Sequence, residues 1–85
     1  MYIVVQHRVS DPAKFREIAK ASMPNLPKGV KLHSVLPNAD GSNTVCLWEA
    51  ATLDAVKNLV EASVGQVSTN QYFTVDAENA VGLPA

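Results

Sequence analysis

Four stretches of the chain are apolar throughout or alternate apolar and polar residues, and each predicts a β-strand. Residues 1–9 and 44–50 carry apolar side chains at both parities, which is typical of interior strands covered on two sides. In residues 30–36 one of the two alternating sets of side chains is more polar than the other, as in an edge strand. Residues 70–75 predict the last strand. The turn formers of residues 37–43 join the second and third strands as a hairpin.

Strict alternation also predicts the faces of the outer strands. In the second strand it places Val30, Leu32, Ser34 and Leu36 on one face, and Lys31, His33 and Val35 on the other. In the last strand it places Gln71, Phe73 and Val75 on one face, and Tyr72 and Thr74 on the other.

Two further stretches repeat apolar residues at spacings of three and four and predict helices. The first begins at Asp11 and Pro12, which suit an N-cap and the first helical position, and it ends before Pro24. Its expected buried stripe is Phe15, Ile18, Ala19 and Ser22 or Met23.

The second helix begins at Thr52 as N-cap and ends at Gly65, which is expected in the left-handed C-terminal position. Its expected buried residues are Val56, Leu59, Val60 and Val64.

The element order βαββαβ with right-handed crossovers places the first and third strands at the centre of the sheet. We therefore predict an α+β fold, a ferredoxin-like sandwich whose four-stranded antiparallel sheet carries two helices on one face. Residues 1–85 form a single domain with no internal boundary. Residues 77–85 have no clear period, but their apolar content predicts a tail packed on the sheet or on a partner subunit.

Two helices cover one sheet face only, yet the central strands are apolar on both. Exposing these side chains costs about 1.5–3 kcal/mol for each large one, which a domain of this size cannot sustain for several. We expect a homodimer that packs sheet on sheet, so forming a dimeric α/β barrel. The alternative is that the C-terminal tail folds over its own sheet.

Composition narrows the possible partners. The formal net charge is −1 and the seven Lys and Arg residues are scattered, so neither nucleic acid nor an anionic membrane is expected as a partner. No apolar run reaches the length of a membrane span, and the single Cys46 excludes an internal disulfide. These features favour a cytoplasmic protein. No metal-ligand spacing and no glycine-rich phosphate loop occurs, so no cofactor is expected.

Three residues are weak candidates for chemistry: His7, Trp48 and Tyr72. In the expected antiparallel pairing His7 lies level with residues 44–46, so topology does not guarantee a contact between His7 and Trp48. Either His7 is the polar group of a pocket whose floor is the sheet, or it is a structural histidine at a strand end. Tyr72 presents its hydroxyl to a pocket or to a dimer mate.

Three other residues with reactive side chains have simpler interpretations. His33 is expected at the surface beside Lys31, and Cys46 is expected to be a small buried packing residue. Glu49 follows Trp48 at the strand end, where it caps the next helix or acts as a base, and capping is the simpler role.

The chain resembles the dimeric α+β barrel superfamily, which includes antibiotic-biosynthesis-type and haem-degrading monooxygenases and many small barrel proteins. Residues 2–9 resemble the opening strand of the haem-degrading group, and Leu47-Trp48-Glu49 resembles its tryptophan-bearing segment. His7 stands where that group has asparagine, and no histidine follows His33, so the resemblance does not extend to a haem ligand.

Three functions remain open. The first is a dimeric barrel that binds a small apolar or aromatic molecule between sheet and helices. The second is a cofactor-independent monooxygenase or isomerase, in which His7, Trp48 or Tyr72 orients a substrate that supplies its own carbanion. The third is a non-catalytic dimerisation or interaction module. The sequence does not decide whether the protein is an enzyme.

Overall fold

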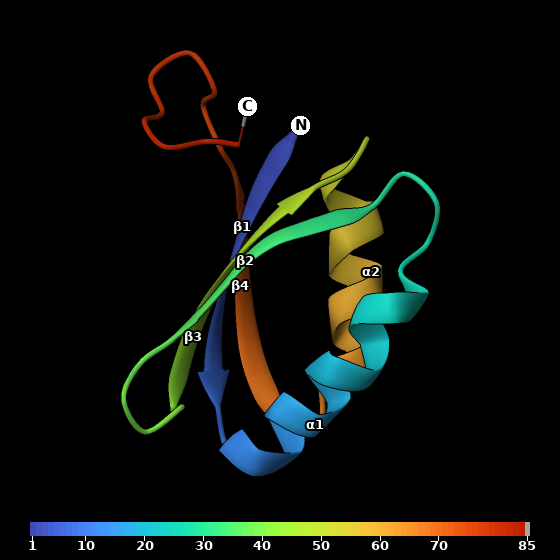
Figure 1. Ribbon diagram of the computed structural model, residues 1–85, viewed down its shortest axis with the longest axis vertical. Coiled ribbons are helices and arrows are strands. Elements are labelled where there is room, and N and C mark those ends of the chain that lie inside the picture. Colours follow the sequence, from blue (N-terminus) through green and yellow to red (C-terminus); the bar gives the residue numbers. More distant parts are fainter. Residues whose placement is uncertain (85) are drawn as a thin grey trace.

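The computed structural model describes residues 1–84, and its elements follow the predicted order βαββαβ (Figure 1). They are β1 (Tyr2–Val9), α1 (Pro12–Ser22), a 3-10 turn η1 (Met23–Asn25), β2 (Lys31–Pro37), β3 (Asn43–Glu49), α2 (Leu53–Val64) and β4 (Ser68–Thr74). Every bound lies within about two residues of its prediction, the usual uncertainty of element ends.

The sheet has the strand order β2-β3-β1-β4, and all neighbouring strands are antiparallel. β1 and β3 are therefore the central strands, and both helices lie on one face of the sheet (Figure 1). The predicted ferredoxin-like α+β sandwich is confirmed.

Both helices begin where capping chemistry predicts. Asp11 accepts a hydrogen bond from the Lys14 backbone N–H at 3.1 Å, with Pro12 at the first position of α1. Thr52 Oγ1 accepts from the Ala55 N–H at 3.1 Å at the start of α2. Neither helix of the described chain has the length and apolarity to cross a bilayer.

Gly65 does not adopt the predicted left-handed conformation, so that prediction is wrong. Its φ is −61° and its ψ is −21°, because the chain continues in the helical sense and the Gly65 N–H donates to the Glu61 carbonyl. A Cβ atom at this position would clash with that Glu61 carbonyl oxygen. Glycine is required here for a close backbone approach instead of a positive φ.

The predicted alternation of β2 is wrong beyond His33. The pairing register shifts between Leu32 and Ser34, so His33 is an extra residue in the strand. Leu32 lies opposite Trp48 and Val35 opposite Cys46, and both line the cavity beneath the helices. Ser34 and Leu36 move to the other face. Strict alternation of side chains, which the sequence prediction assumed, gives no indication of such a bulge.

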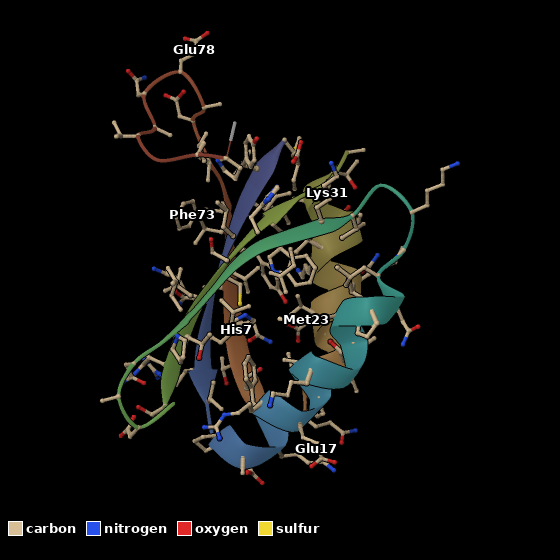
Figure 2. All side chains as sticks on the ribbon, viewed as in Figure 1. His7, Glu17, Met23, Lys31, Phe73 and Glu78 are labelled. Atoms are coloured by element: carbon tan, nitrogen blue, oxygen red, sulfur yellow. The ribbon has the colours of Figure 1, made fainter. Side chains whose placement is uncertain are left out.

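The core lies between the helices and the sheet. Its buried residues are Ile3, Val5, Val9, Phe15, Cys46, Trp48, Ala50, Val56, Val60 and Val64. The other side of the sheet, here called the open face, carries Tyr2, Val4, Ser34, Leu36, Val45, Leu47, Glu49, Gln71 and Phe73. On it Leu36 is 63%, Phe73 48% and Val45 38% exposed. Figure 2 shows Phe73 on the side of the sheet away from the helices.

The segment after β4 turns back towards the N-terminus on the side away from the helices (Figure 1). Asp76 organises the turn by accepting from the Glu78 N–H at 3.1 Å and the Asn79 side chain at 2.8 Å. The Pro84 carbonyl then accepts a hydrogen bond from the Tyr2 hydroxyl at 3.4 Å. The tail thus meets the end of the open face at Tyr2, and Leu36, Val45 and Phe73 stay exposed.

Candidate functional site

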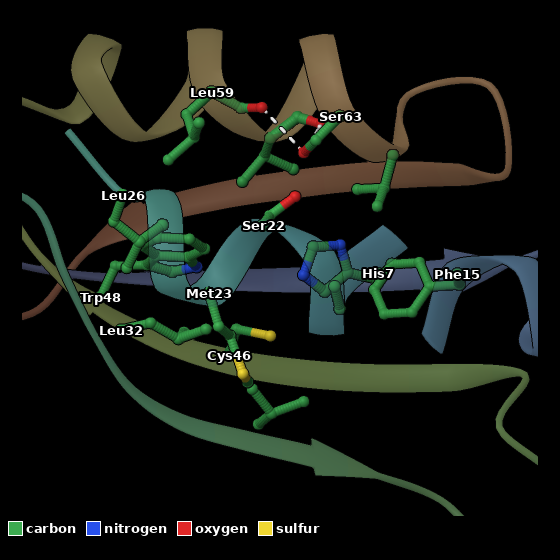
Figure 3. A pocket seen from close by; sticks show the side chains of 14 residues that line it. His7, Phe15, Ser22, Met23, Leu26, Leu32, Cys46, Trp48, Leu59 and Ser63 are labelled. Carbon is green, nitrogen blue, oxygen red and sulfur yellow. Dashed lines mark hydrogen bonds between the residues drawn. The ribbon is translucent and has the colours of Figure 1, made fainter. Parts of the chain in front are cut away.

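His7 and Trp48 line one cavity between the sheet and the helices, here called the helix-face cavity. Trp48 lies opposite Ile3 and His7 opposite Thr44, so the two residues are separated by about 13 Å along the strands. Figure 3 shows the two side chains reaching into the same space, with the indole nitrogen of Trp48 and a ring nitrogen of His7 facing one another. The fold thus brings together two candidates whose contact the topology left undecided.

The rest of the helix-face cavity is largely apolar. From the sheet come Leu32, Val35 and Cys46; from α1 and the turn after it Phe15, Ala19, Ser22, Met23 and Leu26; and from α2 Leu59, Val60, Ser63 and Val64. Ser63 directs its hydroxyl to the carbonyls of Leu59 and Val60 in its own helix, at 2.9 and 3.2 Å. The cavity volume is about 40 Å³, enough for a few water molecules or a small functional group.

The tautomer of His7 is assigned by its neighbour Asn70. His7 Nδ1 lies 2.6 Å from Asn70 Oδ1, and the Asn70 amide group donates to Glu61 Oε2 at 2.9 Å. Because the Asn70 oxygen can only accept, Nδ1 of His7 must carry the proton. Neutral His7 therefore has an unprotonated Nε2 with a free lone pair.

That Nε2 is buried and accepts no hydrogen bond from any group within residues 1–84. His7 is only 4% exposed, and its ring packs edge-on against Phe15 with 5.0 Å between the ring centroids. Burial lowers the pKa of His7 below its ordinary value, while the Asn70 hydrogen bond and the Glu61 charge offset part of that effect. His7 is therefore neutral at pH 7, and its Nε2 can accept a hydrogen bond or a proton.

Trp48 also has a buried polar atom without a hydrogen-bond partner in the described chain, in this case a donor. Its side chain is 7% exposed, and its Nε1–H donates to no acceptor of the described chain. An unsatisfied buried polar group costs about 1–3 kcal/mol. In the part of the chain that the structure describes, one acceptor and one donor without protein partners thus line the same apolar cavity, an arrangement typical of a binding site.

Tyr72 does not line the helix-face cavity, although β4 places it on the helix side opposite Val5. Its hydroxyl donates to Glu61 Oε2 at 2.5 Å. Burial and the Glu61 carboxylate raise the pKa of Tyr72, while the hydrogen bonds from Tyr72 and Asn70 lower the pKa of Glu61. The Tyr72 hydroxyl therefore faces Glu61 and not the helix-face cavity. Its contact with a dimer mate stays a prediction.

Sequence reasoning missed Asn70 and Glu61. Asn70 connects His7 to the carboxylate of Glu61. The register of β1 and β4 places Asn70 directly opposite His7, and Glu61 lies one turn before the end of α2. Once the strand order is known, the antiparallel pairing of the first and last strands would have identified Asn70. Nothing in the sequence marks Glu61.

A second polar cluster lies on the open face. His33 Nε2 is 2.8 Å from Glu49 Oε1, and the His33 ring lies 5.8 Å from that of Tyr2. The sequence analysis gave capping of α2 as the simpler role of Glu49. The N-cap of α2 is instead Thr52, and the Glu49 carboxylate contacts His33. The His33 hydrogen bond and the nearby Lys31 charge lower the pKa of Glu49. The expected surface position of His33 is confirmed in part, since its side chain retains 21% exposure.

Cys46 is buried in the core, as predicted for a packing residue. Burial raises the pKa of its thiol to about 12, so it is protonated at neutral pH and not an activated nucleophile. Within residues 1–84, no group of three His, Cys, Asp or Glu side chains lies close enough together to hold a metal ion.

Comparisons of the chain with models of known protein families, with curated proteins and with solved structures find no match.

Proposed function

We propose that the protein binds a small, mostly apolar molecule with one hydroxyl or carbonyl group in the helix-face cavity. The observation that supports this is a pair of buried groups without partners among residues 1–84, the acceptor Nε2 of His7 and the donor Nε1–H of Trp48. A ligand hydroxyl donates to the first and accepts from the second at once. The apolar lining then selects the hydrocarbon part of the ligand.

A ligand larger than a few atoms has to enlarge the cavity of about 40 Å³. Met23 is the side chain best suited to move, because it lines the cavity, is 45% exposed and has a flexible unbranched side chain. Figure 2 places Met23 on the helix side of the sheet, where η1 begins.

Binding is tested with two rings that differ by one hydroxyl, 2-indanol and indane. Trp48 is the only tryptophan, so its fluorescence reports events in the helix-face cavity. We expect 2-indanol to bind at least about tenfold more tightly than indane, since indane leaves both polar groups unsatisfied. His7→Gln should reduce this preference, and His33→Gln, a histidine on the open face, should preserve it.

Equal affinity for the two rings would contradict the proposed role of the polar pair. Absence of any fluorescence or NMR response to 2-indanol would contradict the binding proposal itself.

We also propose that the open face pairs with that of a second copy, forming a two-fold homodimer of the barrel type. Exposed Leu36, Val45 and Phe73 on one sheet surface support this. Val45→Lys places a charge on a central strand of that surface and should convert a dimer to a monomer in size-exclusion chromatography with light scattering. Val81→Lys is the matched control, because Val81 is fully exposed in the tail. A monomeric unmodified protein at micromolar concentration would contradict the dimer.

A further inference from the structure

We propose that the helix-face cavity catalyses proton transfer on a bound carbonyl compound, with His7 Nε2 as the base and Trp48 Nε1–H as the donor to the carbonyl oxygen. The inference rests on the proposed binding function and assigns a reaction to the same site. It makes His7 and Trp48 catalytic residues, and Asn70 and Glu61 positioning residues.

His7 and Trp48 carry complementary polar groups, an acceptor and a donor. The oxygen and the α-hydrogen of a carbonyl compound are bonded to adjacent carbon atoms, and removal of the proton is favoured by a base at the hydrogen together with a hydrogen-bond donor at the oxygen. His7 and Trp48 supply one of each, and their nitrogens face one another across the helix-face cavity (Figure 3). Both side chains are more than nine-tenths buried, so water competes poorly for either group.

The step is balanced without any other reactant. His7 Nε2 takes the α-proton, the electron pair of the C–H bond becomes the carbon–carbon double bond, and the carbonyl pair moves onto oxygen. The oxygen, now negatively charged, accepts a hydrogen bond from Trp48 Nε1–H. Return of the proton from His7 to the oxygen, or to the carbon at the far end of a conjugated system, completes an isomerisation in which no atom is gained or lost.

The neighbours of His7 favour its role as a base. Asn70 Oδ1 accepts from Nδ1 at 2.6 Å and Glu61 accepts from Asn70 at 2.9 Å, so the imidazolium formed by proton uptake is held by an acceptor backed by a carboxylate. The other titratable groups around it are Tyr72, which bonds to the same Glu61 oxygen, and Cys46. Lys57 lies near Glu61, and α1 contributes only Phe15, Ala19 and Ser22 to the cavity lining.

The environment also defines the substrate class. A buried neutral histidine is a weak base, so the α-hydrogen must be acidified by a second carbonyl group or an adjacent aromatic ring. The lining favours the aromatic alternative, because besides His7 and Trp48 its oxygen and nitrogen side-chain groups are the hydroxyls of Ser22 and Ser63, and its other side chains, such as Phe15, Leu32 and Leu59, are apolar or, in Cys46, a protonated thiol. The expected substrates are small aryl-activated ketones.

The test uses 2-indanone, whose α-hydrogens lie between a carbonyl and an aromatic ring. Exchange of these hydrogens for deuterium in D₂O is followed by proton NMR with and without protein. We expect the protein to accelerate exchange, His7→Gln to lower the catalysed rate by about 100-fold or more, and His33→Gln to leave it unchanged.

Trp48→Phe keeps an aromatic ring but removes the indole N–H, and should lower the catalysed rate about tenfold or more. It serves as the second variant if His7→Gln fails to fold. A folded His7→Gln or Trp48→Phe protein with the full exchange rate would overturn the proposal.

The pH profile separates a base from a structural histidine. The catalysed rate should fall as the pH drops through the pKa of His7, because protonated His7 has no lone pair for the substrate. Glu61→Gln keeps an acceptor for Asn70 but removes the negative charge that favours the imidazolium, so the inflection should move to lower pH. A profile without an inflection, or one that Glu61→Gln leaves in place, would overturn the role of His7 as base.

Binding of 2-indanol distinguishes the two proposals. If 2-indanol binds with its hydroxyl preference but 2-indanone exchanges at the rate of the buffer, the catalytic inference falls and the binding function stands. If neither compound binds, both fall.

Discussion

The two faces of the sheet each hold a histidine that is connected to a glutamate, and the two arrangements differ in how far water reaches them. On the helix side, His7 is 4% exposed and contacts Glu61 only through Asn70. On the open face, the His33 side chain is 21% exposed and contacts Glu49 directly at 2.8 Å. The same pair of residue types is therefore a candidate base on one face and an ordinary, partly solvated hydrogen-bonded pair on the other.

Burial explains the difference. Desolvation acts against the charged form of His7, so this histidine is held neutral with one lone pair facing an apolar cavity. The glutamate near His33 is itself partly solvated, and water screens that pair. A histidine near a carboxylate acquires distinctive chemistry only where water is excluded, and in this fold only the helix side provides that.

The largest expected difference between the faces is in packing, and neighbouring valines of β1 measure it. Val5 is fully buried against the helices, whereas Val4 lies on the open face. Val5→Ala should lower the free energy of unfolding by about 2–3 kcal/mol, from two lost methyl groups and the space they leave. Val4→Ala should cost less than about 1 kcal/mol in a monomer. Urea denaturation at micromolar protein concentration measures both.

Protein concentration sharpens this comparison. If the open face forms a dimer interface, the unfolding midpoint should rise with concentration, and Val4→Ala should cost more as the dimer becomes populated. Equal losses for the two variants at a concentration where the protein is monomeric would show that the open face is packed as tightly as the core.

The next effect is the pH dependence of stability that His7 produces. Because its pKa is lower in the folded protein than the ordinary 6.5, the unfolded chain binds the proton first as the pH falls. His7 stabilises the fold fully above pH 6.5, and this contribution is lost as the pH drops from 6.5 through the lowered pKa. Denaturation midpoints measured between pH 7.5 and about 5 should decline over this window.

His7→Gln should flatten the decline, and His33→Gln should retain it. The window lies above the ordinary pKa of 4.5 for Glu49 and Glu61, so carboxylate protonation contributes little there. A decline that survives His7→Gln would mean that another group titrates in this range.

The fold could be predicted because its determinants are local. Apolar patterns, the caps at Asp11 and Thr52 and the right-handed crossover rule together specify the order and pairing of the strands. The two errors arose where tertiary contacts override local rules. His33 is inserted as a bulge, which reverses the facing of the rest of β2, and Gly65 is required by a close carbonyl and not by its own φ.

The candidate site was predictable only in part. His7 and Trp48 attract attention as rare residues in central strands, but the shared cavity depends on how α1 and η1 pack above them, which the sequence pattern does not determine. Asn70 is an ordinary polar residue of an edge strand until the register places it opposite His7. The chemistry of His7 depends on how deeply the side chain is buried. The periodicity of the sequence predicts only which face of the sheet the side chain occupies.

The smallest expected effect is the uncoupling of the open-face pair. His33→Ala removes the hydrogen bond that contributes most to the lowered pKa of Glu49, so that pKa should rise towards its ordinary 4.5. Lys31→Met, which removes only a nearby charge, should raise it less. Carboxyl carbon NMR titration measures both. A carboxyl group whose pKa is lower in the folded than in the unfolded protein stabilises the fold at pH values above the unfolded pKa. Glu49 therefore contributes stability that the unmodified protein loses as the pH falls through its folded pKa, and His33→Ala should remove part of that contribution and no other. The His7 titration should stay in place, because the sheet separates the two clusters; a shift of His7 in His33→Ala would mean that the two faces are electrostatically coupled through the sheet.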